Sequence, residues 1–113
     1  MPFVKLNTNV EVDDKPALLR SLSQVTVKET GKPENYVMVE INDRSEMLFA
    51  GQHTPLAYLE CKSIGLTEKQ AKGLSAALCQ LVSTQLNVNA DRIYIEFSNA
   101  PAAFWGYNGS TFG

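Results

Sequence analysis

The stretch Val37-Met38-Val39-Glu40-Ile41 recurs in altered form 56 positions further on, as Ile93-Tyr94-Ile95-Glu96-Phe97. Both stretches follow the order apolar, large, apolar, Glu, apolar, so their side chains alternate between two faces, as in a half-buried β-strand. The offset is close to half of the 113 residues. The sequence therefore predicts an internal duplication within a single domain, with pseudo-repeats of about residues 1–56 and 57–113.

Apolar positions at helical spacing follow the same offset. They are Leu18 and Leu74, Leu22 and Leu78, and Val25 and Leu81. We expect one helix to begin after Asp13 or Asp14 and to end at Gly31. A second helix should run from about Glu68 to Leu86, since Thr67-Glu68-Lys69-Gln70 has the form of a capping box.

Four strands complete the predicted α/β domain. They are Pro2 to Asn7, Tyr36 to Asn42, Tyr58 to Ile64, and Arg92 to Ser98. Each half is then predicted to contain a strand, a helix and a second strand, in that order. Two helices cover only one face of a four-stranded sheet. The other face carries Met38, Glu40, Tyr94 and Glu96, and these large, mixed side chains favour a subunit interface over open solvent.

Composition and charge exclude several classes of function. The net charge is −2 and there is no basic block, so we do not expect nucleic acid as a partner. There is no apolar run of about 18 residues to cross a membrane, and no visible secretory signal, which makes the cytoplasm the expected location. The single histidine, His53, and the separated Cys61 and Cys79 favour neither a metal site nor a Cys/His catalytic pair. We expect no cofactor.

The last fourteen residues form an unusual segment. They hold Phe104, Trp105, Tyr107 and Phe112 among small residues. Because so many aromatic side chains are rarely left in water, we expect this segment to dock on another surface.

Six short motifs in this chain resemble those of the macrophage migration inhibitory factor family, part of the tautomerase superfamily. They occur in the family's order and span nearly the whole chain: Met1-Pro2, Asn7-Thr8-Asn9-Val10, Gly31-Lys32-Pro33, Ser63-Ile64-Gly65, Asp91-Arg92-Ile93-Tyr94-Ile95, and Asn108-Gly109-Ser110-Thr111-Phe112. The resemblance implies a β-α-β repeat with a mixed sheet, assembled as a homotrimer. It also implies keto-enol tautomerase activity on phenylpyruvate-like and dopachrome-like compounds.

Pro2 is the expected catalytic base. If Met1 is removed, Pro2 becomes a secondary amine at the start of a strand, and only its neutral form can accept a proton. An α-amino group titrates near ~8, so burial and a nearby cation should help by disfavouring the protonated form. The resemblance implies that Lys32 is this cation and that it holds the substrate carboxylate or carbonyl oxygen. The plainer interpretations are a strand-starting proline and a solvated lysine at a helix end.

Five further residues are assigned to the substrate site by the resemblance alone. Ser63 and Ile64 match pocket residues on the third strand, with the Ile64 amide as a donor to the substrate. Tyr36 and Phe112 match aromatic walls. Tyr94 matches a tyrosine supplied by the adjacent subunit of the trimer. Purely structural roles in the core or at the interface are the alternatives.

The chain departs from the mammalian family pattern at the pocket. Glu96 replaces an asparagine, and its carboxylate should repel an anionic substrate or, paired with Lys32, raise the pKa of the proline. Trp105 replaces a small aliphatic residue and Tyr107 a tryptophan, so the pocket entrance should be reshaped. A Cys-x-x-Cys motif is absent, because Leu56-Ala57-Tyr58-Leu59 occupies its place.

These observations predict a homotrimeric isomerase that acts on small aryl 2-oxo acids, with Pro2 as general base and acid. One alternative is a cytokine-like binding trimer that retains the pocket without relying on it. A purely structural oligomer is another.

Overall fold

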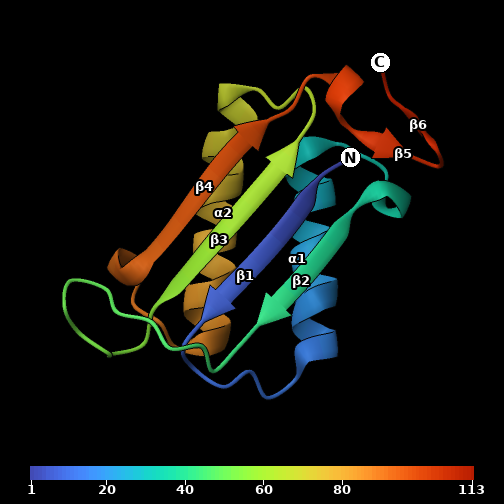
Figure 1. Cartoon of the computed structure of the whole chain (residues 1–113). Coiled ribbons are helices and arrows are strands. Elements are labelled where there is room, and N and C mark those ends of the chain that lie inside the picture. Colours follow the sequence, from blue (N-terminus) through green and yellow to red (C-terminus); the bar gives the residue numbers. More distant parts are fainter.

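A four-stranded sheet carries both long helices on one of its faces in the computed structural model, which describes residues 1–113 (Figure 1). The elements are β1 (Phe3–Thr8), α1 (Lys15–Thr30), β2 (Met38–Asn42), β3 (Ala57–Ser63), α2 (Glu68–Leu86) and β4 (Ile93–Asn99). The strand order is β2-β1-β3-β4, with β1 and β3 antiparallel and the two outer pairs parallel. The predicted fold class is therefore confirmed, mixed sheet included.

Both helices begin and end at the residues that the sequence favours. Asp14 is the N-cap of α1, because its carboxylate accepts a hydrogen bond from the Ala17 amide at 3.1 Å. Gly31 ends α1 in the left-handed region, with φ of 71°. At the start of α2, Thr67 and Gln70 form the complete capping box.

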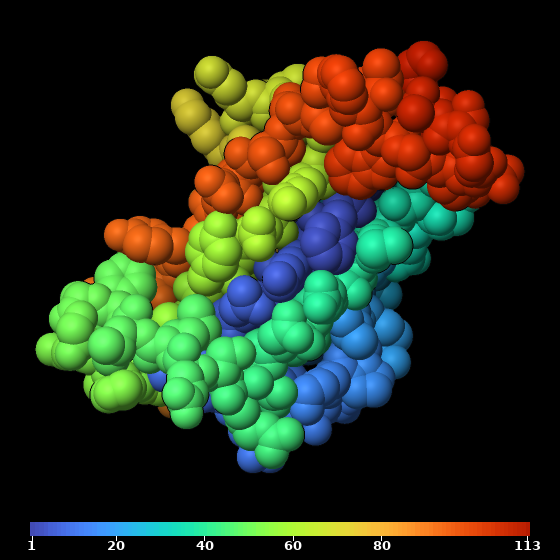
Figure 2. Space-filling view, in the orientation of Figure 1, coloured from blue at the N-terminus to red at the C-terminus, as the bar shows by residue number.

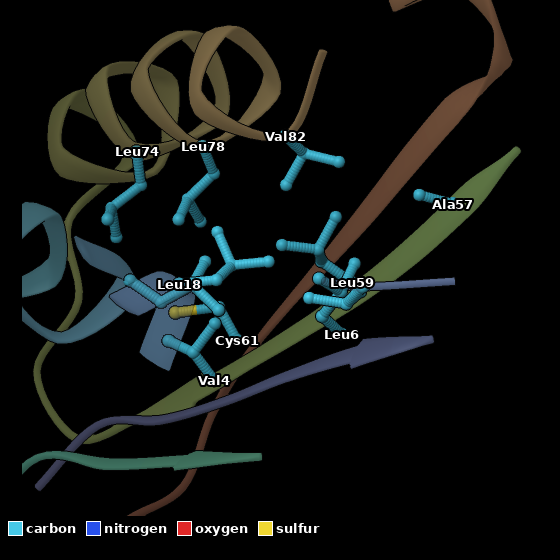
Figure 3. Packing of buried hydrophobic residues seen from close by; sticks show 11 residues of the cluster. Val4, Leu6, Leu18, Ala57, Leu59, Cys61, Leu74, Leu78 and Val82 are labelled. Carbon is cyan, nitrogen blue, oxygen red and sulfur yellow. The ribbon is translucent and has the colours of Figure 1, made fainter. Parts of the chain in front are cut away.

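The core lies between the sheet and the helices. Figure 3 shows Leu74, Leu78 and Val82 of α2 pointing toward the strands, where they meet Leu6 and Leu59. All five side chains are fully buried. Leu18 and Leu22 bring α1 into the same cluster, so the helical positions related by the 56-residue offset are core positions in both halves.

The strands differ from their predicted bounds by one or two residues, and the later starts of β2 and β4 have a local reason. Tyr36 lies in a 3₁₀ turn, η1 (Glu34–Tyr36), and β2 starts only at Met38. Arg92 likewise ends a 3₁₀ turn, η2 (Ala90–Arg92), just before β4. In each case the turn follows an extended residue, Pro33 or Asn89, and its polar residues favour a turn over a strand.

The aromatic C-terminal segment folds back on the sheet end. It forms a third short turn, η3 (Ala102–Phe104), and a hairpin of β5 (Gly106–Tyr107) and β6 (Ser110–Thr111). Asn108 and Gly109 at the hairpin tip have φ of 53° and 79°, the pair of positive values that an Asn-Gly turn adopts readily. Figure 2 shows this segment, in red, against the blue start of β1.

The face of the sheet opposite the helices is uncovered in the single chain (Figure 1). Met38 and Tyr94 on this face are each 65% exposed, and Glu40 and Glu96 are exposed as well. Neither helix combines the length and the apolar composition needed to pass through a bilayer.

Candidate functional site

A cavity of about 430 Å³ opens where β1 begins. Four segments distant in the sequence form its walls: the chain start, η1 with the first residue of β2, the end of β3, and the C-terminal hairpin. The lining residues are Met1, Pro2, Phe3, Asn35, Tyr36, Val37, Met38, Lys62, Trp105, Gly106, Tyr107 and Phe112. Of the site residues predicted from the sequence, Pro2, Tyr36, Trp105 and Phe112 are brought together here.

Three aromatic rings form one wall of the cavity. The Tyr36 ring meets those of Tyr107 and Phe112 edge to face, at centroid distances of 5.6 and 6.2 Å. Tyr107 and Phe112 stack on each other at 5.5 Å with an interplanar angle of 13°. These contacts have the favoured aromatic geometries, so the wall is a well-packed surface for a flat apolar group.

Pro2 is a buried residue in the lining of this cavity. Its side chain is less than 2% exposed, and its carbonyl accepts a hydrogen bond from the Met38 amide at 3.0 Å. In a parallel pair this bond belongs to the first partners of the register, Phe3 and Met38, and it ties Pro2 to the first residue of β2. A proline fits this end position because the missing amide proton leaves no unsatisfied donor.

The amino group of Met1, next to Pro2, has a lowered pKa. Burial is the larger cause that lowers the pKa of the Met1 amino group below its ordinary value, and the positive charge of Lys32 lowers it further. The site therefore favours a neutral amine, which is the form that accepts a proton.

Lys32 does not line the cavity. It follows the left-handed Gly31, and its backbone amide donates to the Thr30 hydroxyl at 3.2 Å. Lys32 acts on the Met1 amino group electrostatically, because its positive charge lowers the pKa of that group.

Ser63 and Ile64 lie outside the cavity of the single chain. Ser63 ends β3 and is fully buried, while Ile64 follows the strand and is half-buried. The Ser63 carbonyl accepts a hydrogen bond from the Ala100 amide at 2.9 Å, which fastens the segment after β4 beside it.

Tyr94 and Glu96 also lie away from this cavity. Tyr94 pairs with Tyr58, and Tyr58 with Asn7, so Tyr94 belongs to the end of the sheet opposite Pro2. Its ring packs on Phe49 at a centroid distance of 4.7 Å. The Glu96 carboxylate accepts a hydrogen bond from the Tyr58 hydroxyl at 3.1 Å. A single chain thus does not bring either side chain to its own Pro2.

Lys62 is the charged lining residue that the sequence analysis missed; the uncharged Phe3, Asn35, Val37 and Gly106 were not predicted there either. Lys62 is the only charged side chain among the cavity residues. The alternation along β3 places it on the uncovered face, but only the register, in which Lys62 pairs with Phe3, shows that it lies beside the start of β1.

Metal-binding and thiol chemistry have little support elsewhere in the chain. No group of three or more His, Cys, Asp or Glu side chains is arranged to hold a metal ion. Burial raises the pKa of the Cys61 thiol to about 11, which keeps it in its unreactive protonated form at neutral pH.

Fold and cavity together define a class of small β-α-β repeat proteins in which an aromatic cavity lies at the start of the first strand. The model of the macrophage migration inhibitory factor (MIF) family matches residues 1–113, and the chain belongs to this family.

Similar proteins come from distant organisms. The chain is 36% identical to a macrophage migration inhibitory factor homolog of Brugia malayi, over the full length of both, and 39% identical to macrophage migration inhibitory factor of Meriones unguiculatus, over 99% of both. Among solved structures, the homologue from Prochlorococcus marinus has a TM-score of 0.94 at 40% identity, covering 98% of this chain and 99% of that one.

Proposed function

We propose that the protein is a cytoplasmic keto-enol tautomerase that acts on aryl 2-oxo acids such as phenylpyruvate, with dopachrome-like compounds as further substrates. Family membership and fold support a tautomerase type of activity. The observation that carries the proposal is the position of Pro2, which is buried next to the chain start and lines a cavity walled by aromatic rings. The lowered pKa of the Met1 amino group beside it supports an environment that disfavours a protonated amine.

The reaction follows from these features once Met1 is removed. The neutral Pro2 nitrogen takes a proton from the carbon next to the substrate carbonyl, and negative charge develops on the carbonyl oxygen. The positive charge of Lys32 stabilises that oxygen. The protonated Pro2 then delivers the proton to the oxygen, which completes the enol. The same steps in reverse convert enol to ketone, and the aromatic wall holds the aryl group throughout.

The complete site in this proposal needs a homotrimer. Tyr94 lies too far along the sheet to reach the Pro2 of its own chain, and it is exposed on the uncovered face. A neighbouring subunit packed on that face would bring its Tyr94 to the cavity mouth, and Glu96 with it. Ser63 and Ile64 would complete the substrate contacts from the end of β3.

The test combines intact mass with enol-keto conversion of phenylpyruvate. We expect a mass without Met1, rapid conversion by the wild type, and a loss of at least 100-fold in Pro2→Gly, in line with the usual contribution of a general base. Pro16→Gly is the matched control, because it removes a proline ring from the exposed first turn of α1. Retained Met1, or equal conversion by wild type and Pro2→Gly, would contradict the proposal.

Signalling by a binding trimer is the second candidate, and the names of the curated relatives favour it. It predicts saturable binding to a receptor by Pro2→Gly as strong as that of the wild type. The tautomerase proposal instead predicts that the biological effect of the protein is lost in variants that have lost tautomerase turnover, such as Pro2→Gly.

A further inference from the structure

The cavity contains one charged side chain, and it is cationic. Lys62 lies one residue before the end of β3 and pairs with Phe3, next in sequence to Pro2. Its side chain is 53% exposed, and it lines the cavity together with Pro2 and Phe3. The ammonium group therefore belongs to the exposed part of a pocket that has no other charged side chain.

The charge of Lys62 is poorly neutralised within the chain. Its only acidic neighbour is Glu60, with 3.9 Å between Lys62 Nζ and Glu60 Oε1. An ion pair at that separation, in which the lysine is exposed, contributes little. A weakly paired ammonium in the lining of an aromatic pocket is suited to a ligand with a flat apolar body and an anionic end.

Lys32 has a different position. It acts on the amino group through its charge but is absent from the cavity wall. One lysine thus lines the space that a ligand occupies, whereas the other acts through its charge from outside the lining. This division allows the two cations to serve different oxygens of one substrate.

We propose that Lys62 is a specificity-determining residue that binds the carboxylate of the aryl 2-oxo acid. Lys32 instead stabilises the charge on the carbonyl oxygen and favours the neutral form of the base. The inference rests on the proposed function for the identity of the substrate. It adds to that function by assigning to Lys62 the preference of the site for an acid over its neutral ester.

The test measures binding without chemistry. Benzoylformate is an aryl 2-oxo acid with no proton on the carbon beyond its carbonyl, so it cannot be enolised, and its methyl ester lacks the charge. We expect Lys62→Gln to raise the Kd for benzoylformate about fivefold, the effect of one partly exposed charge pair, and to leave the Kd for the ester unchanged. Lys72→Gln, on the exposed side of α2, should change neither value.

A second variant tests the same charge from the opposite side. Glu60→Gln removes the acidic neighbour and should lower the Kd for benzoylformate while leaving the ester unaffected. Equal effects of Lys62→Gln on acid and ester, or no effect on either, would overturn the inference.

The outcome is separable from that of the proposed function. Loss of phenylpyruvate conversion in Pro2→Gly tests the base, whereas the ratio of acid to ester binding tests Lys62. If the wild type binds benzoylformate with no preference over the ester, the Lys62 inference fails even where Pro2 proves catalytic.

Discussion

The charge of Lys32 lowers the pKa of the Met1 amino group, although Lys32 does not line the cavity which that amino group borders. Burial of the amine acts in the same direction and is the larger cause. Both effects favour the neutral amine, so together they adapt the chain start to accept a proton.

Lys32→Gln should move the pH dependence of turnover. The neutral amine is the active form, so kcat/KM falls as the pH drops through the pKa of the amine. Without the lysine charge this pKa rises, and the fall should begin at a higher pH than in the wild type. The measurement is kcat/KM for phenylpyruvate against pH. Lys72→Gln should keep the wild-type profile, and an unshifted profile in Lys32→Gln would show that its charge does not reach the base.

Asp43→Asn should change the acid stability of the fold. The Asp43 carboxylate accepts a hydrogen bond from the Val12 amide at 2.9 Å and pairs with Lys15 at 3.1 Å. The amide hydrogen bond is the main cause that lowers the pKa of Asp43 below its ordinary 3.8. A lowered pKa stabilises the folded state above pH 3.8, and this stabilisation is lost as the pH falls through the folded-state value.

The wild type should therefore lose stability more steeply than Asp43→Asn below about pH 4. Urea midpoints measured from pH 7 to pH 2 at one protein concentration provide the check. Asp13→Asn, at an exposed position, is the control and should follow the wild type. Parallel curves for wild type and Asp43→Asn would contradict the assignment.

Arg92→Lys should loosen the loop before β3. The Arg92 guanidinium donates to the carbonyls of Phe49, Gln52, Thr54 and Pro55 at 3.0–3.2 Å. It also lies over the Phe49 ring at 5.2 Å. Lysine cannot reproduce this planar array of donors, so we expect a loss of about 2 kcal/mol in the free energy of unfolding.

Limited proteolysis gives a local measure of the same change, with faster cleavage between residues 49 and 55 in Arg92→Lys. Arg20→Lys, on the exposed side of α1, should be cleaved at the wild-type rate. If both variants resist protease equally, the guanidinium contacts do not restrain this loop.

Ser23→Ala should weaken the attachment of η1 to α1. The buried Ser23 hydroxyl donates to the Glu34 carboxylate at 2.7 Å, and η1 carries Tyr36 to the cavity. Loss of this bond should cost about 1 kcal/mol of unfolding free energy. It should also raise the KM for phenylpyruvate, because Tyr36 becomes less ordered. Ser75→Ala on α2 is the matched helix control, and an equal response of the two variants would argue against a role for Ser23 in the site.

Most of the fold follows from local patterns in the sequence. The capping box at Thr67 and the apolar spacing fix α2, and alternation fixes which side of β4 meets the core. The 3₁₀ turn at Tyr36 escaped prediction because a single turn has no periodicity of its own. The order of elements along the chain likewise does not determine which strands pair, so the antiparallel pairing of β1 with β3 could not be predicted from it.

The candidate site was predictable only in part for the same reason. Pro2, Tyr36, Trp105 and Phe112 were assigned from a family resemblance, and the structure brings them to one cavity. Lys62 belongs to no motif, and its place beside Pro2 depends on a long-range strand register. The roles of Lys32, Ser63, Ile64, Tyr94 and Glu96 in substrate binding are still predictions.

The cavity walls include both Pro2 and Phe112. During synthesis on the ribosome, β1 and α1 emerge long before the hairpin that carries Tyr107 and Phe112. A chain stalled after β4 holds every core residue from Val4 to Val82 but lacks two of the three rings of the aromatic wall, those of Tyr107 and Phe112. The binding pocket is thus completed only after the core, so a nascent chain can acquire its core before it can recognise a ligand.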